Sequence, residues 1–136
     1  MMKVGRGVLT AIQAHARREA PHECCGLLLG TATRIAEAVP ARNVAAEPSR
    51  QYEISPEDHF AVMRRCRTSG GGVTVVGGYH SHPHSRPDPS PTDREQAFQE
   101  FIYVIAGPVD GSASLEIRAY ELRDGALRPI TLWVSD

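Results

Sequence analysis

Apolar residues recur at helical spacing in two segments of the chain, and each segment has clear boundary signals. In residues 7–19 the apolar side chains fall on one face of a helix, and Pro21 ends that helix. The sequence SPED at 55–58 predicts the start of a second helix, because serine caps the first turn, proline fits it and acids favour its positive end. The glycines at 70–72 end this second helix.

Runs of apolar and β-branched residues predict a sheet. The expected strands are 24–30, 32–39, 52–55, 73–82 and 101–108, followed by a hairpin over 115–134 that turns at Asp124-Gly125. A short third helix is expected over residues 91–101. Together these elements predict one domain over residues 1–136, of the α/β or α+β class, with a mixed sheet flanked by helices.

Composition is that of an ordinary globular protein. Of the 136 residues, 41% are hydrophobic and 23% are charged, and the formal net charge is −1. This balance offers no basic field for nucleic acid or an anionic membrane, and no apolar run approaches the roughly 20 residues that span a bilayer. The apolar residues near the N-terminus are too interrupted by charge to be a signal peptide. We therefore expect a cytoplasmic protein without nucleic-acid or membrane partners; the sequence leaves its oligomeric state open.

The three cysteines do not form a recognisable metal or redox motif. Cys24 and Cys25 are adjacent, Cys66 is distant, and no C-x-x-C occurs. We expect reduced, mostly buried thiols that act as small apolar side chains, with a thiol near a metal as the alternative.

The segment GGYHSHPHSRPDPSPTD, residues 77–93, carries the candidate chemistry. His80 and His82 are two positions apart at the end of a predicted strand, so both imidazoles leave the same face, roughly 7 Å apart along the backbone. Asp93 follows after ten intervening residues, at the third position of a helix that Ser90 caps. Two nitrogens and one carboxylate oxygen leave a fourth position open for water, which is typical of a catalytic zinc site.

A hydrolytic zinc site also needs a proton acceptor and an oxyanion donor. Glu23 lies directly before a buried apolar strand, where a surface glutamate has little reason to be, and is the candidate that moves a proton from water to the leaving amine. The Ser90 hydroxyl is the candidate donor to the oxyanion of a tetrahedral intermediate.

These residues resemble a known signature. Glu23 precedes C-C-G-L-L-L-G at 24–30, and H-S-H-P at 80–83 is followed by Ser90 and Asp93. The arrangement is similar to the JAMM signature of the MPN-plus metalloproteases: a glutamate, then H-x-H-P, a spaced serine, and an aspartate three positions later. All of these positions are present here in order, so a chance match is improbable.

The resemblance covers the chain from the first helix to the strand near 102–106. It implies a JAB/MPN fold, similar to that of cytidine deaminases. It also implies zinc ligation by His80, His82 and Asp93, with Glu23 as general acid/base and Ser90 as oxyanion donor. Small bacterial and archaeal members of this family act on ubiquitin-fold sulfur-carrier proteins, hydrolysing the bond after a C-terminal Gly-Gly or releasing an attached cysteine. The insertions that grip ubiquitin chains in larger relatives do not fit between the predicted elements here.

Other interpretations remain for several of these residues. Taken alone, His80 and His82 are also typical of two strand histidines that are hydrogen-bonded at the edge of a sheet, without a metal. Ser90 and Asp93 also match a helix capping box, and we expect capping and oxyanion donation to compete for the serine hydroxyl. His84 is a further imidazole close to the pair, for which a role at the rim is favoured over ligation.

Three functions other than proteolysis are alternatives for this sequence. MPN domains without metal serve as scaffolds in large complexes, but those lack one or more ligands. A nucleoside or base deaminase requires H-x-E and P-C-x-x-C, and neither string occurs. A JAB domain associated with DNA repair requires nucleic-acid affinity that the charge balance does not support.

Overall fold

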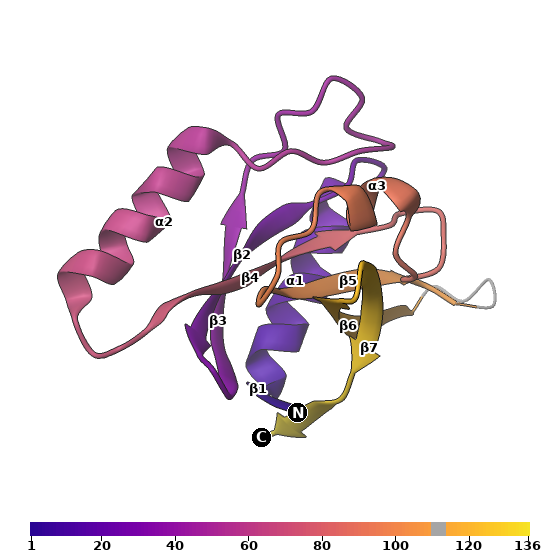
Figure 1. Ribbon diagram of the computed structural model, residues 1–136. Coiled ribbons are helices and arrows are strands. Elements are labelled where there is room, and N and C mark those ends of the chain that lie inside the picture. The colour runs from indigo at the N-terminus through magenta and orange to yellow at the C-terminus, as the bar shows by residue number, and fades with distance from the viewer. Residues whose placement is uncertain (110–113) are drawn as a thin grey trace.

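A single curled sheet organises the computed structural model, which describes residues 1–109 and 114–136 (Figure 1). The strands are β1 (Met2–Gly5), β2 (Cys25–Thr31), β3 (Arg34–Ala41), β4 (Thr74–Ser81), β5 (Ile102–Pro108), β6 (Leu115–Arg123), β7 (Ala126–Ile130) and β8 (Leu132–Ser135). Their order in the sheet is β7-β6-β5-β4-β2-β3-β1-β8. Parallel pairs (β1 with β3 and β8, β4 with β5) are combined with antiparallel ones, which confirms the mixed sheet.

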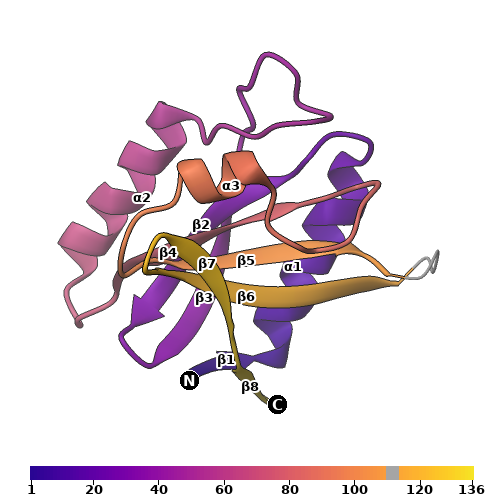
Figure 2. The same ribbon diagram turned by 45° about the vertical axis from the view of Figure 1, so that its right-hand side comes forward.

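Two long helices cover opposite faces of this sheet, and a short one lies above one strand end. They are α1 (Arg6–Glu19), α2 (Pro56–Ser69) and α3 (Pro91–Glu95). Leu28 of β2 packs in the cluster that contains Ile12 of α1, whereas Leu27 and Leu29 pack with Val62 of α2. Figure 2 shows α1 and α2 on different sides of the strands. Because side chains alternate along a strand, the apolar run of β2 packs against both helices.

Local sequence explains how α2 begins and ends. The hydroxyl of Ser55 accepts a hydrogen bond from the Asp58 N–H at 3.3 Å, and Pro56 occupies the first turn. Gly70, just after the helix, has φ +66°, a conformation that glycine adopts without strain. The predicted boundaries of this helix are confirmed.

Three of the predicted elements differ from the structure. The third helix ends at Glu95 instead of residue 101, because the chain turns back to enter β5, with the Phe98 N–H donating to the Tyr103 hydroxyl at 2.6 Å. The predicted strand at 52–55 is reduced to one bridge between Asn43 and Ile54.

The third difference concerns the second arm of the hairpin predicted over residues 115–134. The predicted hairpin turn is confirmed: Asp124 and Gly125 have φ values of +53° and +76°, as in the tight turns that suit twisted strands. The second arm ends at Ile130, however, and the chain continues as β8 at the opposite edge of the sheet, beside β1. The sequence pattern did not predict β1 either, because a strand of four residues is too short to show periodicity.

Within residues 1–109 and 114–136, none of the helices has the length and apolar character needed to cross a bilayer. Cys24, Cys25 and Cys66 are free thiols, the first two buried and the third half-buried.

The contact between β4 and β5 leads to a stability prediction for Gly77. A Cβ at this position would lie 1.8 Å from the carbonyl oxygen of Ile102, its register partner in β5. We expect Gly77→Ala to lower the free energy of unfolding by about 1–3 kcal/mol, because backbone must move to make room. Gly7→Ala, at a site in α1 with nothing within 4 Å, is the control and should raise it by about 0.5–1 kcal/mol. Urea unfolding curves measure both; equal effects would contradict this account.

Candidate metal centre

The pairing of β2 with β4 brings distant residues to one edge of the sheet. The two strands are antiparallel, and Cys25 lies opposite His80, so the start of β2 meets the end of β4. Glu23 lies just before β2 and His82 just after β4. The main chains continue this pairing beyond the strands, since the Ser81 N–H donates to the Cys24 carbonyl at 3.1 Å.

Three of the five candidate side chains converge at this edge. His80 Nε2 lies 3.3 Å from His82 Nε2 and 3.2 Å from Asp93 Oδ1, and His82 Nε2 lies 3.2 Å from Asp93 Oδ2. The side chains of His80, His82 and Asp93 are 2%, 8% and 9% exposed. Water therefore does little to screen these groups from one another.

The donor set is suited to a cation. The Nδ1–H of His82 donates to the Arg86 carbonyl at 2.8 Å, so the neutral ring keeps its lone pair on Nε2, facing the cluster. Burial lowers the pKa of His80, which favours its neutral form despite the nearby carboxylate of Asp93. Lone pairs that face one another at these distances repel unless a proton or a cation lies between them.

The Asp93 carboxylate is fixed by its own helix. The Ser90 N–H donates to Asp93 Oδ2 at 2.9 Å and the Asp93 N–H donates to Ser90 Oγ at 3.0 Å, which completes a capping box. Burial by itself raises the pKa of Asp93, but contacts with His80 and His82 outweigh it and hold that pKa well below its usual range. Burial likewise opposes a charge on His82, yet its contacts with Asp93 and the Arg86 carbonyl raise its pKa. The carboxylate is thus ionised at neutral pH and aimed at both imidazoles.

Glu23 is a buried carboxyl beside this cluster. It is 8% exposed. Burial raises its pKa to about 7, and the neighbouring charges of His82 and Asp93 act on it in opposite directions. A carboxyl with this pKa changes protonation state near neutral pH, as a proton-transfer group requires.

Residues 5–122 match the family of prokaryotic homologues of the JAB domain. The chain belongs to this JAB family. It is 39% identical over 121 residues to a desampylase from Haloferax volcanii, covering 84% of this chain and 86% of the relative. It is also 33% identical to a probable TtuB-protein conjugate cleaving protease from Thermus thermophilus, covering 92% of this chain and 78% of the relative. The crystal structure of a JAB1/MPN domain protein from Archaeoglobus fulgidus has the same fold, with a TM-score of 0.65, 22% identity and coverage of 99% of this chain and all of that one.

The convergent side chains of this JAB domain fit one zinc ion. The ligand atoms of His80, His82 and Asp93 lie within 4.8 Å of one another, close enough to share a single ion. Two imidazole nitrogens and one carboxylate oxygen are ligands that zinc accepts, and three protein ligands leave one position open.

Ser90 is bonded to Asp93 through both its N–H and its hydroxyl, and its cap leaves the hydroxyl proton available. Its Oγ accepts the Asp93 N–H through a lone pair. A hydroxyl has one donor and two acceptor sites, so the O–H remains able to donate elsewhere. The competition that we expected between capping and oxyanion donation therefore does not arise.

Other candidate groups lie outside the cluster. His84 is exposed and does not belong to the convergent set. Burial raises the pKa of Cys24 to about 11 and that of Cys25 to about 12, so both thiols are protonated at neutral pH and are poor ligands.

Tyr52 is a functional candidate that the sequence did not reveal. Its ring stacks on His80, with 4.3 Å between ring centroids and 19° between planes. It also lines a cavity of about 380 Å³ together with Ile54, Gly77, Gly78 and Phe98. No spacing rule marks a lone tyrosine in a loop, so only the structure places it here.

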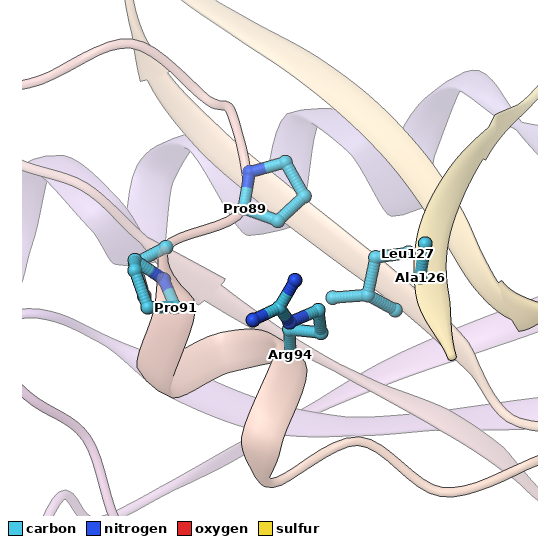
Figure 3. Close-up of a pocket in the computed structure, with 6 residues that line it drawn as sticks. Pro89, Pro91, Arg94, Ala126 and Leu127 are labelled. Carbon is cyan, nitrogen blue, oxygen red and sulfur yellow. The ribbon is translucent and has the colours of Figure 1, made fainter.

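A second cavity lies between α3 and β7. It has a volume of about 310 Å³, and Ser90 and Arg94 line it together with Pro89, Pro91, Ala126 and Leu127. Figure 3 shows the Arg94 guanidinium directed into the space between Pro89 and Leu127. None of the three convergent side chains lines this cavity, and no ring in it stacks on His80 as Tyr52 does in the first cavity.

The cluster predicts metal content that analysis of the purified protein can test. We expect one zinc ion per chain, retained through gel filtration and measured by inductively coupled plasma mass spectrometry. His82→Ala should abolish stoichiometric zinc, because it removes a nitrogen from the shared site. His84→Ala is the matched control, since its ring is exposed and outside the cluster, and zinc should stay bound. Loss of zinc in both variants would show that the ligand set is wrong.

Proposed function

We propose that this protein is a zinc-dependent metalloprotease that cleaves a peptide or isopeptide bond after the C-terminal Gly-Gly of a ubiquitin-fold sulfur-carrier protein. The observation that carries the proposal is the convergence of His80, His82 and Asp93 beside the buried carboxyl of Glu23 in a JAB-family chain. The names of the relatives support the substrate class, since one is a desampylase and another is a probable protease for TtuB-protein conjugates.

His80, His82 and Asp93 are the proposed zinc ligands. A zinc ion held by them supplies Lewis acidity, which polarises a carbonyl group and makes water a stronger acid. The protein contributes a fixed ligand geometry, since the His82 ring is oriented by the Arg86 carbonyl and the Asp93 carboxylate by the Ser90 N–H.

Glu23 is the proposed general base and acid. Its carboxylate takes the proton of the attacking water and passes it to the leaving amine. Burial holds the pKa of this group at about 7, so both the acceptor and the donor form are accessible at neutral pH.

Ser90 is the proposed oxyanion donor. Its O–H donates to the developing negative oxygen of the tetrahedral intermediate, while its lone pair keeps the first turn of α3 capped. The capping box fixes the position of this hydroxyl before the substrate arrives.

The cavity lined by Tyr52 is the proposed path of the substrate tail. Gly77, Gly78 and Tyr52 all line this cavity, and the Tyr52 ring stacks on His80, so the cavity reaches the cluster. A Gly-Gly end suits such a groove because it presents no side chains to Tyr52.

The three free thiols support a reducing compartment, and we infer a cytoplasmic location from them. We also infer that residues 1–136 form one JAB/MPN domain, because strands from both ends of the chain join the same sheet.

Cleavage of a defined substrate tests the proposal. A ubiquitin-fold sulfur carrier extended by a short peptide past its Gly-Gly should be cut after the second glycine by the zinc-loaded protein. Glu23→Gln should retain zinc and lose at least about 100-fold in kcat, because the proton acceptor is removed. Mass spectrometry of the products measures both. No cleavage of any extended carrier by the zinc-loaded wild type would refute the substrate assignment, and full turnover by Glu23→Gln would refute the role of Glu23.

The two roles of Ser90 are separable by substitution. Ser90→Ala should lower kcat by about 100-fold or more through loss of the oxyanion donor, and should lower stability by about 1 kcal/mol through loss of the cap. Ser90→Thr keeps a hydroxyl and should restore much of both. Steady-state kinetics and thermal unfolding of the three proteins give the answer; a stability loss in Ser90→Ala with unchanged kcat would leave the serine as a cap alone.

A further inference from the structure

The side-chain amide of Asn43 holds together the loop of residues 42–55, which lies beside Glu23. The Nδ2 of Asn43 donates to the carbonyl of Glu23 at 3.0 Å and to the carbonyl of Gln51 at 2.9 Å. Its Oδ1 accepts the N–H groups of Ala45 and Glu53, each at 3.0 Å. The same Nδ2 makes a longer contact of 3.5 Å with the Pro48 carbonyl. An amide has two donor and two acceptor sites, so every site of Asn43 is engaged.

The loop is hydrogen-bonded to both the N–H and the carbonyl of Glu23. While Asn43 donates to the Glu23 carbonyl, the Glu23 N–H donates to the Pro48 carbonyl at 2.7 Å. Glu23 lies between the end of α1 and the start of β2, so regular secondary structure does not fix its backbone. Its position relative to the sheet edge therefore depends on this loop.

The loop itself is anchored at its base and reaches the metal cluster. The Ser55 N–H donates to the Arg42 carbonyl at 2.9 Å, and the Val44 N–H donates to the Glu53 carbonyl at 2.9 Å. Between these contacts the chain carries Tyr52, whose ring stacks on His80. The same loop thus touches a proposed ligand at one point and the backbone of the proposed general base at another.

We propose that Asn43 is a positioning residue that holds Glu23 in its catalytic placement. The inference rests on the proposed function, in which Glu23 moves the proton. Asn43 does not touch the reacting atoms; it acts through the peptide groups of Glu23. A displacement of about 1 Å at a catalytic group costs on the order of 100-fold in rate, so a bond to its backbone carries a catalytic effect.

Asn43→Asp separates positioning from simple loop folding. The substituted carboxylate still accepts the Ala45 and Glu53 N–H groups, but its second oxygen faces the carbonyls of Glu23 and Gln51 and repels them. We expect kcat to fall about 10- to 100-fold, with zinc content unchanged and KM within about twofold of wild type. A loop that had lost its fold would also raise KM, because Tyr52 and Ile54 line the groove.

A double-mutant cycle tests whether the effect passes through Glu23. In the Glu23→Gln background, Asn43→Asp should cause no further loss of kcat, because the group that it positions is already gone. Arg50→Gln is the matched control in the same loop: it removes an exposed ion pair with Glu47 and should leave kcat unchanged. Equal losses from Asn43→Asp in both backgrounds would overturn the proposal.

Amide hydrogen exchange gives a readout that does not depend on activity. The Glu23 N–H should be protected in the wild type and in Arg50→Gln, and should exchange at least about tenfold faster in Asn43→Asp. An unchanged rate for Glu23 in Asn43→Asp would overturn the proposal even if kcat fell. If the wild type cleaves no carrier, the proposed function fails, whereas this measurement still decides whether Asn43 holds the backbone of Glu23.

Discussion

The antiparallel pairing of β2 with β4 is the contact on which the site depends. It places Cys25 opposite His80, and so brings the start of one strand and the end of the other to the same edge of the sheet. Glu23 and His82, far apart in the chain, thereby become neighbours. Since side chains alternate along a strand, a slip of one residue in this register would turn His80 to the opposite face and dismantle the cluster.

Packing on the opposite face of β2 and β4 holds these two strands in register. Tyr79 lies opposite Gly26, and its ring fills the space where a side chain on Gly26 would be: a Cβ there would lie 2.3 Å from the ring. The Tyr79 hydroxyl is in turn hydrogen-bonded to Nδ1 of His15 in α1 at 2.8 Å. The ring thus ties α1 to the register of the two strands, and the chemistry on one face relies on packing on the other.

Much of the fold and of the metal cluster could be predicted from the sequence, because both depend on short, regular spacings. The alternation that placed His80 and His82 on one face, and the serine cap that placed Asp93, are properties of adjacent residues. Tyr52 and Asn43 lie in a loop whose conformation is set by contacts with distant segments, so no local pattern identifies them. Strand β1 was missed for a similar reason, since it is too short to show a period and forms by pairing with β3 and β8. The residues of β8 were predicted as strand, but their place beside β1 depends on contacts with the other end of the chain.

The capping box in α3 has a consequence for how a cation is acquired. The Asp93 carboxylate is already immobilised by the Ser90 N–H and the imidazole of His82 by the Arg86 carbonyl. Their conformational entropy is lost when the chain folds, not when the ion arrives. Binding of an ion would therefore cost little further side-chain entropy, and the preference between ions would depend on the chemical hardness of two nitrogens and one oxygen.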